Sequence, residues 1–217
     1  SSKKSNSLNL LEKIVDYGYS PLLTPSAFAL ALLCEKINKD KNRVLLTGIG
    51  GDEIFCGYYV NYLSHILSYK NQQEQNEKFL FWKNNIKKYI RNDKMKDFNE
   101  AGKKENRYRL NYHIEGETVI NNYIKNYKKI RIKKLHKDIF YNNMLQNIHY
   151  QSIPSQLYQT DYVSMFFSIE NRSPFLSKNL FEYTFKLNKN FFMYKGKPKA
   201  ILRQSMKKNF PKIILNN

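Results

Sequence analysis

A short apolar segment that runs into a glycine-rich turn constrains the fold of this chain most strongly. Val44 to Leu46 has three apolar residues in succession, a pattern typical of a strand that is buried on both faces of a parallel sheet. The preceding segment Phe28 to Cys34 is apolar almost all round a predicted helix, and Thr24 with Pro25 forms a favourable helix start. Helix, polar loop and apolar strand make half of a parallel α/β unit. The sequence therefore predicts an α/β fold with a parallel sheet.

The turn after this strand is a candidate phosphate site. Gly48, Gly50 and Gly51 can adopt positive φ and let the backbone approach a phosphate. Ligands of open α/β sheets lie beyond the carboxyl ends of the strands, where Asp52 and Glu53 follow. A carboxylate there can hold Mg²⁺ against phosphate oxygens. The alternative is an ordinary turn without a ligand.

Three blocks of the sequence share their order and spacing with one known family. They are Thr47 to Tyr58, Pro154 to Leu176 and Gly196 to Arg203. The family patterns are Ser-Gly-acid-Gly-x-Asp-Glu-x-Phe-x-Gly-Tyr for the first block, Asp-x-x-Ser-Met and Glu-x-Arg-x-Pro-Phe-Leu for the second, and Gly-x-x-Lys-x-x-Leu-Arg for the third. The chain resembles the synthetase domain of the glutamine-dependent asparagine synthetases over Pro21 to Pro211, with a poorly matching middle.

The resemblance implies an ATP-dependent ligase of asparagine biosynthesis. In the family, ATP transfers AMP to a carboxylate and releases pyrophosphate, and a nitrogen nucleophile then displaces AMP to form an amide. ATP and Mg²⁺ are the implied cofactors, and the implied fold is an ATP-pyrophosphatase-like (adenine nucleotide alpha hydrolase-like) domain. The implied partners are a small carboxylate such as aspartate and a nitrogen donor from an upstream or separate glutaminase. The implied location is the cytoplasm.

The resemblance also assigns roles to individual residues. Asp52 is the expected metal ligand, and Lys199 and Glu53 are the expected catalytic residues. Substrate contacts or structural ion pairs are expected of Asp161, Glu170, Arg172 and Arg203. The ATP site is expected to comprise Thr47, Gly48, Ile49, Gly50, Gly51 and Lys199.

Lys199 has two interpretations from its local sequence. Pro198 fits the first position of a helix, which would place Lys199 in the first turn, where a cation is unfavourable unless an anion binds. The alternative is an exposed lysine in water. If Lys199 and Asp52 attend one phosphate chain, their charged groups should lie roughly 5 to 10 Å apart near a shared Mg²⁺.

Asp161 shares a predicted helix face with Leu157 and Met165, in a helix expected to run from Ser152 to near Pro174. A buried carboxylate at that position needs a partner, and Arg172 is the expected one. Asp161 could therefore form a structural ion pair or contact the substrate, and the sequence supports both roles.

Ile49 departs from the family pattern, which has an acid between the two glycines. The resemblance implies that this acid binds substrate or moves protons, and isoleucine can do neither. Cys56 is a smaller departure. Two alternatives therefore stay open: a relative that forms amides or lactams on a peptide or small molecule, and a truncated, non-catalytic accessory or binding module.

The rest of the chain is expected to be helical and incomplete as a domain. Three parts are expected: 1–60 with the strand and turn, 61–151 as a helical lobe, and 152–217 as a helical C-terminal part. Leu80, Phe81 and Trp82 are the expected core of the lobe, and Gly102 and Gly116 its breaks. No second strand of comparable quality is evident. The family's Ser-Gly-Gly-x-Asp-Ser loop and its glutaminase cysteine are absent from these 217 residues, so we expect the C-terminal portion of a synthetase domain.

A net charge of +19 is compatible with nucleic-acid binding, but the distribution of the lysines favours solvated helix faces. Lysines alternate with apolar residues at helical spacing, as in Ile130 to Lys137. No apolar run approaches the roughly 20 residues of a membrane span. The two cysteines have no metal-ligand spacing and are expected to be free thiols.

Overall fold

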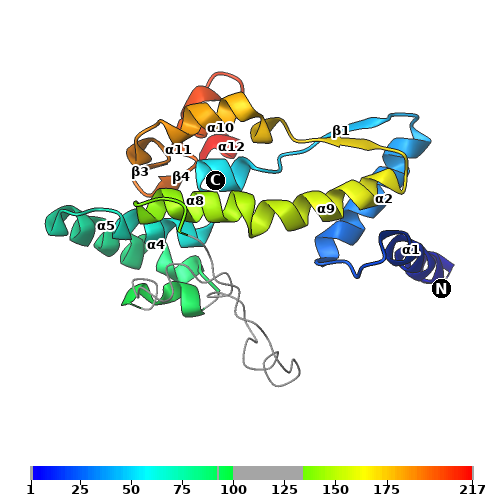
Figure 1. Ribbon diagram of the computed structural model, residues 1–217, viewed down its shortest axis with the longest axis horizontal. Helices are drawn as coiled ribbons and strands as arrows, with labels where there is room; N and C mark the ends of the chain where they lie inside the picture. Colours follow the sequence, from blue (N-terminus) through cyan, green and yellow to red (C-terminus); the bar gives the residue numbers. More distant parts are fainter. Residues whose placement is uncertain (1, 92, 100–133, 217) are drawn as a thin grey trace. The chain divides into compact units, whose positions relative to one another are not determined.

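The computed structural model describes residues 2–91, 93–99 and 134–216 (Figure 1). The chain forms two compact units, one from residues 1–50 and 152–181 and the other from residues 51–151 and 182–217. These units group the chain differently from the three consecutive parts expected above.

The first unit holds three helices, two strands and a short 3₁₀ helix. They are α1 (Ser2–Gly18), α2 (Pro25–Lys39), β1 (Val44–Leu46), α9 (Ser152–Met165), β2 (Glu170–Arg172) and η3 (Pro174–Leu176). α10 (Lys178–Phe185) begins in this unit and ends in the second.

The described residues of the second unit form short helices and one hairpin. They are α3 (Gly51–Phe55), α4 (Tyr59–Leu67), α5 (Gln72–Asn85), η1 (Lys87–Tyr89), η2 (Asp93–Lys96), α8 (Ile139–His149), η4 (Lys189–Phe191), β3 (Met193–Tyr194), β4 (Lys197–Pro198), α11 (Ala200–Ser205) and α12 (Lys212–Asn216). Gly102 and Gly116, the expected breaks in the lobe, lie outside the described residues.

β1 and β2 form a parallel pair, which confirms the α/β class with a small parallel sheet. Val44 is opposite Glu170, and Leu46 is opposite Arg172. The expectation of one long helix from Ser152 to near Pro174 was wrong, because α9 ends at Met165 and the chain then turns back into β2. β2 carries no apolar run, so its strand character comes from backbone pairing with β1.

The core of the first unit lies where α1 and α2 pack against α9. Its buried members are Ile14, Ala31, Tyr162 and Val163. Gly18 allows the close approach of α1, because a Cβ at that position would fall 2.7 Å from the Tyr162 ring.

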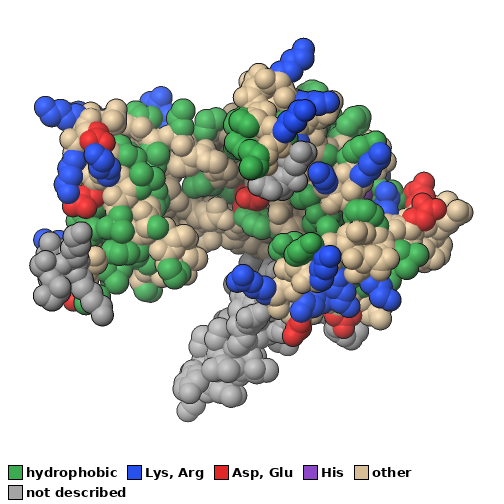
Figure 2. Space-filling view, turned by 180° about the vertical axis from the view of Figure 1, so that it is seen from behind, with side chains coloured by type: hydrophobic (Ala, Val, Ile, Leu, Met, Phe, Trp, Pro, Cys, Tyr) green, Lys and Arg blue, Asp and Glu red, His purple; other side chains and the backbone are tan. Residues whose placement is uncertain are grey.

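The expectation that α2 and both faces of β1 are buried was wrong for the described part of the chain. α2 begins at Pro25 as expected but buries one face, through Ala27, Ala31 and Cys34, while Leu32 and Leu33 are 44% and 49% exposed. On β1, Val44 and Leu46 are exposed, and β1 pairs with no described strand other than β2. Figure 2 shows hydrophobic side chains at the surface among polar ones. Lys and Arg side chains occur there in several separate groups, as expected of solvated helix faces.

Two apolar clusters form the core of the second unit. The first joins α4 and α5 to the hairpin and comprises Tyr62, Leu63, Ile66, Trp82, Ile90 and Met193. The second comprises Cys56, Phe140, Met144 and Phe192. The expected burial of Trp82 is confirmed, whereas Leu80 and Phe81 are 54% and 40% exposed. None of the described helices has the length and apolar character that a membrane crossing requires.

The β3–β4 hairpin carries the third sequence block. Its two-residue loop has positive φ at both positions, 47° at Lys195 and 73° at Gly196, as a type I′ turn requires. This tight turn is followed within three residues by Lys199.

Candidate functional site

The two parallel strands of the first unit end side by side. The backbone N–H of Thr47 donates to the carbonyl oxygen of Arg172 over 2.8 Å, which extends the pairing by one residue. The hydroxyls of Thr47 and Ser173 lie 3.0 Å apart in a hydrogen bond. Two hydroxyl groups therefore mark the carboxyl end of this strand pair, where ligands of parallel sheets bind.

The glycine-rich turn begins at this edge. Gly50 has a φ of +90°, and a Cβ there would fall 2.8 Å from Cγ of Leu176, so both the backbone angle and the packing require glycine. Gly48 has open space where a Cβ would project. Ile49 is half-buried between them. The turn thus combines one position fixed by packing with one position open to approach.

Asp52 and Lys199 form an ion pair in the second unit. Oδ1 of Asp52 lies 2.6 Å from Nζ of Lys199, with the side chains 43% and 30% exposed. The convergence of the first and third sequence blocks is thus observed, as a direct contact closer than the expected 5 to 10 Å. The structure brings together two charged groups that the sequence holds far apart.

Lys199 is held in a left-handed backbone conformation. Its φ is 55°, and its N–H donates to the carbonyl oxygen of Phe55, at the end of α3, over 3.1 Å. The expectation that Pro198 opens a helix was wrong: Pro198 ends β4, and Lys199 directly precedes α11. The type I′ hairpin and the α3 contact together aim Lys199 at Asp52.

Gly57 gives the ion pair its space. A Cβ on Gly57 would fall 2.5 Å from Cε of Lys199 and 2.7 Å from Cγ of Asp52. Its N–H donates to the carbonyl oxygen of Asp52 over 2.8 Å. Next to it, Cys56 has a φ of 62°. A positive φ favours glycine, which gives a physical reason for the usual glycine at the Cys56 position.

Glu53 faces the interior and is only 2% exposed. Its Oε1 accepts a hydrogen bond of 2.5 Å from the Tyr58 hydroxyl. The backbone N–H of Tyr58 in turn donates to the side-chain oxygen of Asn61. Glu53 therefore braces the turn between α3 and α4, on which Asp52 and Gly57 depend. A direct catalytic role for Glu53 stays a prediction.

The expected pair between Asp161 and Arg172 does not form. Arg172 instead pairs with Glu170, with Nε and Oε1 2.9 Å apart, because alternate residues of a strand share a face. The hydrogen bond from Arg172 lowers the pKa of Glu170. Asp161 does share its face with Leu157 and Met165, but this face of α9 is exposed, and no ion pair joins Asp161 to a described residue. Solvation therefore satisfies the Asp161 carboxylate.

Arg203 has a structural environment. Its guanidinium donates to the carbonyl oxygen of Pro198 over 3.0 Å and to that of Leu215 over 2.9 Å. These bonds tie α11 to the end of β4 and to the C-terminal helix α12. Arg203 therefore fixes the segment that presents Lys199.

Asp52 fits a metal that arrives with a phosphate-bearing substrate. Among the described residues no cluster of three His, Cys, Asp or Glu side chains could hold a metal ion. Mg²⁺ is commonly bound by one or two carboxylates plus substrate phosphates, and the half-exposed Asp52 can supply one such carboxylate. Ser173, Tyr58 and Gly57 are site residues that sequence reasoning did not single out, although all three lie inside the matched blocks.

Comparison with known proteins identifies the family of the chain. The family model for asparagine synthase matches residues 2–217. Neither the search of curated proteins nor the search of solved structures gave a significant match. The matched family comprises ATP-dependent ligases that form carbon–nitrogen bonds. Because the match covers nearly every residue, the chain belongs to the asparagine synthase family.

Proposed function

We propose that this chain carries part of the site of a ligase that activates a carboxylate with ATP and forms an amide by attack of ammonia or an amine. The Asp52–Lys199 ion pair is the observation that supports this most directly. A carboxylate and a lysine in contact are the pair of charges that an Mg²⁺–phosphate group needs, one for the metal and one for the phosphate oxygens.

In this proposal Asp52 and Lys199 separate when nucleotide binds. Asp52 would hold Mg²⁺ in place of its lysine partner, and Lys199 would be free to bind the phosphate oxygens. Mg²⁺ would supply positive charge against the pyrophosphate leaving group. Lys199 offsets charge on the phosphate during carboxylate activation. Gly57 leaves space for both side chains in their paired positions.

The turn from Thr47 to Gly51 is proposed to contact the nucleotide through its backbone. Gly48 is open to approach, and the Thr47 and Ser173 hydroxyls stand at the same strand end. The substrate is proposed to be a small carboxylate such as aspartate, with nitrogen from an upstream or separate glutaminase. Because the reaction consumes ATP and the buried Cys34 and Cys56 are free thiols, we propose a cytoplasmic setting.

Ile49 favours a second candidate within the same chemistry. Its half-buried apolar side chain stands where the family pattern has an acid. A site without that charge suits an apolar peptide or small molecule, on which an amide or lactam would be formed. Comparison of aspartate with a larger, apolar carboxylate as co-ligand of MgATP distinguishes the two candidates.

The proposal is tested by phosphorus NMR of MgATP titrated with the 217-residue chain. We expect saturable broadening of the β- and γ-phosphate signals. Lys199→Met and Asp52→Asn should each weaken binding about ten- to a hundredfold, the value of a charged contact. Lys197→Met is the matched control, because Lys197 is exposed on β4, two residues before Lys199. Absence of saturable binding, or equal losses in Lys199→Met and Lys197→Met, would contradict the proposal and favour a non-catalytic module.

A further inference from the structure

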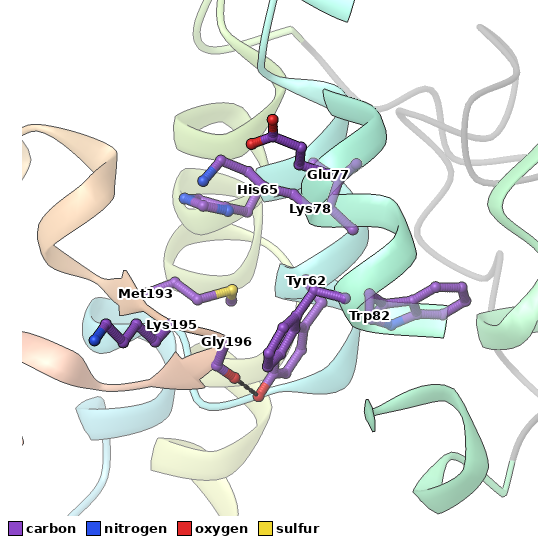
Figure 3. A pocket seen from close by; sticks show the side chains of 10 residues that line it. Tyr62, His65, Glu77, Lys78, Trp82, Met193, Lys195 and Gly196 are labelled. Atoms are coloured by element: carbon purple, nitrogen blue, oxygen red, sulfur yellow. Dashed lines mark hydrogen bonds between the residues drawn. The ribbon is translucent and has the colours of Figure 1, made fainter. Parts of the chain in front are cut away.

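A concave site lies within the second unit, next to the hairpin turn that precedes Lys199 in the sequence. It is a pocket of about 190 Å³ between α4, α5 and the β3–β4 hairpin. Figure 3 shows the lining side chains, which come from these three elements. None of Asp52, Glu53, Lys199 or the glycine-rich turn lines it.

Aromatic and apolar side chains form most of its wall. Tyr62, Phe81 and Trp82 supply three aromatic rings, and Ile66 and Met193 supply apolar surface. A cavity of about 150 Å³ lined by apolar residues is enough to bind benzene. A pocket of about 190 Å³ therefore has room for one aromatic ring with a short substituent.

The hairpin turn gives this pocket a defined shape. The Tyr62 hydroxyl donates to the carbonyl oxygen of Gly196 over 2.9 Å, which joins α4 to the turn (Figure 3). A Cβ on Gly196 would fall 2.5 Å from Cζ of Phe81. Glycine therefore lets the Phe81 ring lie directly on the turn, and the wall is built by packing rather than by chance exposure.

The polar groups around the pocket favour an anion. Lys78 and Lys195 both line it, against one acid, Glu77. Neither lysine forms an ion pair with a described acid: Nζ of Lys78 lies over the Tyr69 ring and Nζ of Lys195 over the Tyr194 ring. His65, the other group of the lining that could carry a positive charge, is 3% exposed, and burial and Lys78 lower its pKa to about 3, so it adds no positive charge at neutral pH.

Trp82 also lacks a hydrogen-bond partner. Its indole N–H is buried and has no acceptor among the described residues. Buried donors are normally paired. Because this N–H has almost no accessible surface, it lies behind the wall of the pocket and is not a ligand contact.

We propose that the pocket binds a small aromatic carboxylate, with the ring against Tyr62, Phe81 and Trp82 and the carboxylate toward Lys78 and Lys195. This site goes beyond the nucleotide chemistry proposed above and does not depend on it. A cationic ligand in an aromatic cage is the alternative for such a wall. The two lysines oppose it.

Trp82 is the chain's single tryptophan, and its fluorescence reports on this pocket and on a neighbouring hollow that Trp82 shares with Phe79 and Phe98. The Phe81 and lysine variants below assign the response to this pocket, because none of these residues lines the other hollow. The probes are phenylacetate, benzyl alcohol and benzylamine, which share a ring and differ in charge. We expect a saturable change with phenylacetate in the millimolar range or tighter, as suits a ligand of about ten heavy atoms. Benzyl alcohol should bind several-fold more weakly, and benzylamine at least about tenfold more weakly.

Two sets of variants distinguish the contribution of the aromatic wall to binding from that of the lysine charges. Phe81→Ala should weaken all three probes, with Leu80→Ala, the exposed and non-lining neighbour, as its matched control. Lys78→Ala combined with Lys195→Ala should remove most of the preference for phenylacetate, with the exposed, non-lining Lys88→Ala as control.

Three results would overturn the assignment. They are an unsaturable response to phenylacetate, benzylamine binding as tightly as phenylacetate, and an unchanged charge preference in the double lysine variant. Competition between MgATP and phenylacetate would show that the pocket belongs to the nucleotide site, which would also refute a separate site. If MgATP and phenylacetate bind independently, the result supports a separate site, even if the proposed ligase reaction is refuted.

Discussion

Acid should destabilise the second unit through His65, and the size of the effect follows from its burial. His65 packs edge-on against the rings of Tyr69 and Phe140, and its Nε2 lies 3.2 Å from the Tyr69 hydroxyl. Burial, with Lys78 and Lys189 nearby, lowers its pKa from 6.5 to about 3. The imidazole ring of His65 is therefore neutral in the folded protein above about pH 3.

The direction of the change in stability with pH depends on whether the folded or the unfolded chain binds the proton on His65. Between the two pKa values the unfolded chain holds a proton on His65 that the folded chain does not, so stability is full above pH 6.5 and is lost as the pH falls. Each pH unit in this range is worth about 1.4 kcal/mol. From about pH 7.5 to about pH 5, the loss should therefore be about 2 kcal/mol. This value hardly changes if the folded pKa is about one unit higher, because pH 5 still lies above it.

The assay is urea unfolding followed by Trp82 fluorescence, because Trp82 lies in the same unit. With a urea dependence of about 2 kcal/mol per molar, His65 should lower the midpoint by about 1 M at the lower pH. His65→Gln removes the titrating group, so the stability gap between wild type and variant should narrow by about 2 kcal/mol on acidification. His149→Gln, at an exposed position of α8, is the control. A gap that stays constant within about 0.5 kcal/mol would refute the reasoning.

Four further outcomes are expected. In ATP–pyrophosphate exchange the 217-residue chain should show no activity above a heat-inactivated control; activity would refute the expectation that it lacks a required loop. Gly57→Ala should force Asp52 and Lys199 apart and weaken MgATP binding at least about tenfold by phosphorus NMR. Lys199→Gly should leave stability unchanged or raise it by up to about 1 kcal/mol while it weakens that binding about ten- to a hundredfold. Burial raises the pKa of the Cys56 thiol well above its ordinary value, so a thiol reagent at neutral pH should modify Cys56 only as fast as the second unit opens.

The sequence predicted the helix from Pro25 and the strand from Val44 because both rest on local signals. Thr24 and Pro25 form a helix start, and three apolar residues form a strand that needs no distant information. β2 could not be found in this way. Glu170, Asn171 and Arg172 are polar, and their strand character exists only through pairing with β1.

Burial was harder to predict than secondary structure. Leu32 and Leu33 are as apolar as Ala31, yet they are exposed because α9 covers only one face of α2. Phe81 is exposed for a similar reason, since α5 turns Trp82 inward one position later. Which face is covered depends on partners that no local pattern names.

The proximity of Asp52 and Lys199 was predictable from the order of the sequence blocks that match the family, and not from the residues around either side chain. Nothing near Lys199 in sequence indicates Asp52, and the helix expected from Pro198 would have aimed the lysine differently. The left-handed φ of Lys199 is set by the hairpin and by the bond to Phe55. Tertiary contacts, rather than helix propensity, therefore place this side chain.

Stability alone gives a poor account of the Asp52–Lys199 arrangement. Both side chains are partly in water, and such ion pairs contribute about 0–1 kcal/mol. Beside them, Cys56 and Lys199 both hold positive φ, which costs a non-glycine residue roughly 1–2 kcal/mol each. The backbone strain therefore exceeds what the ion pair returns. Strain that the pair does not offset, next to a glycine that keeps room for both side chains, is what a site poised for a charged ligand requires, because ligand contacts can supply the difference.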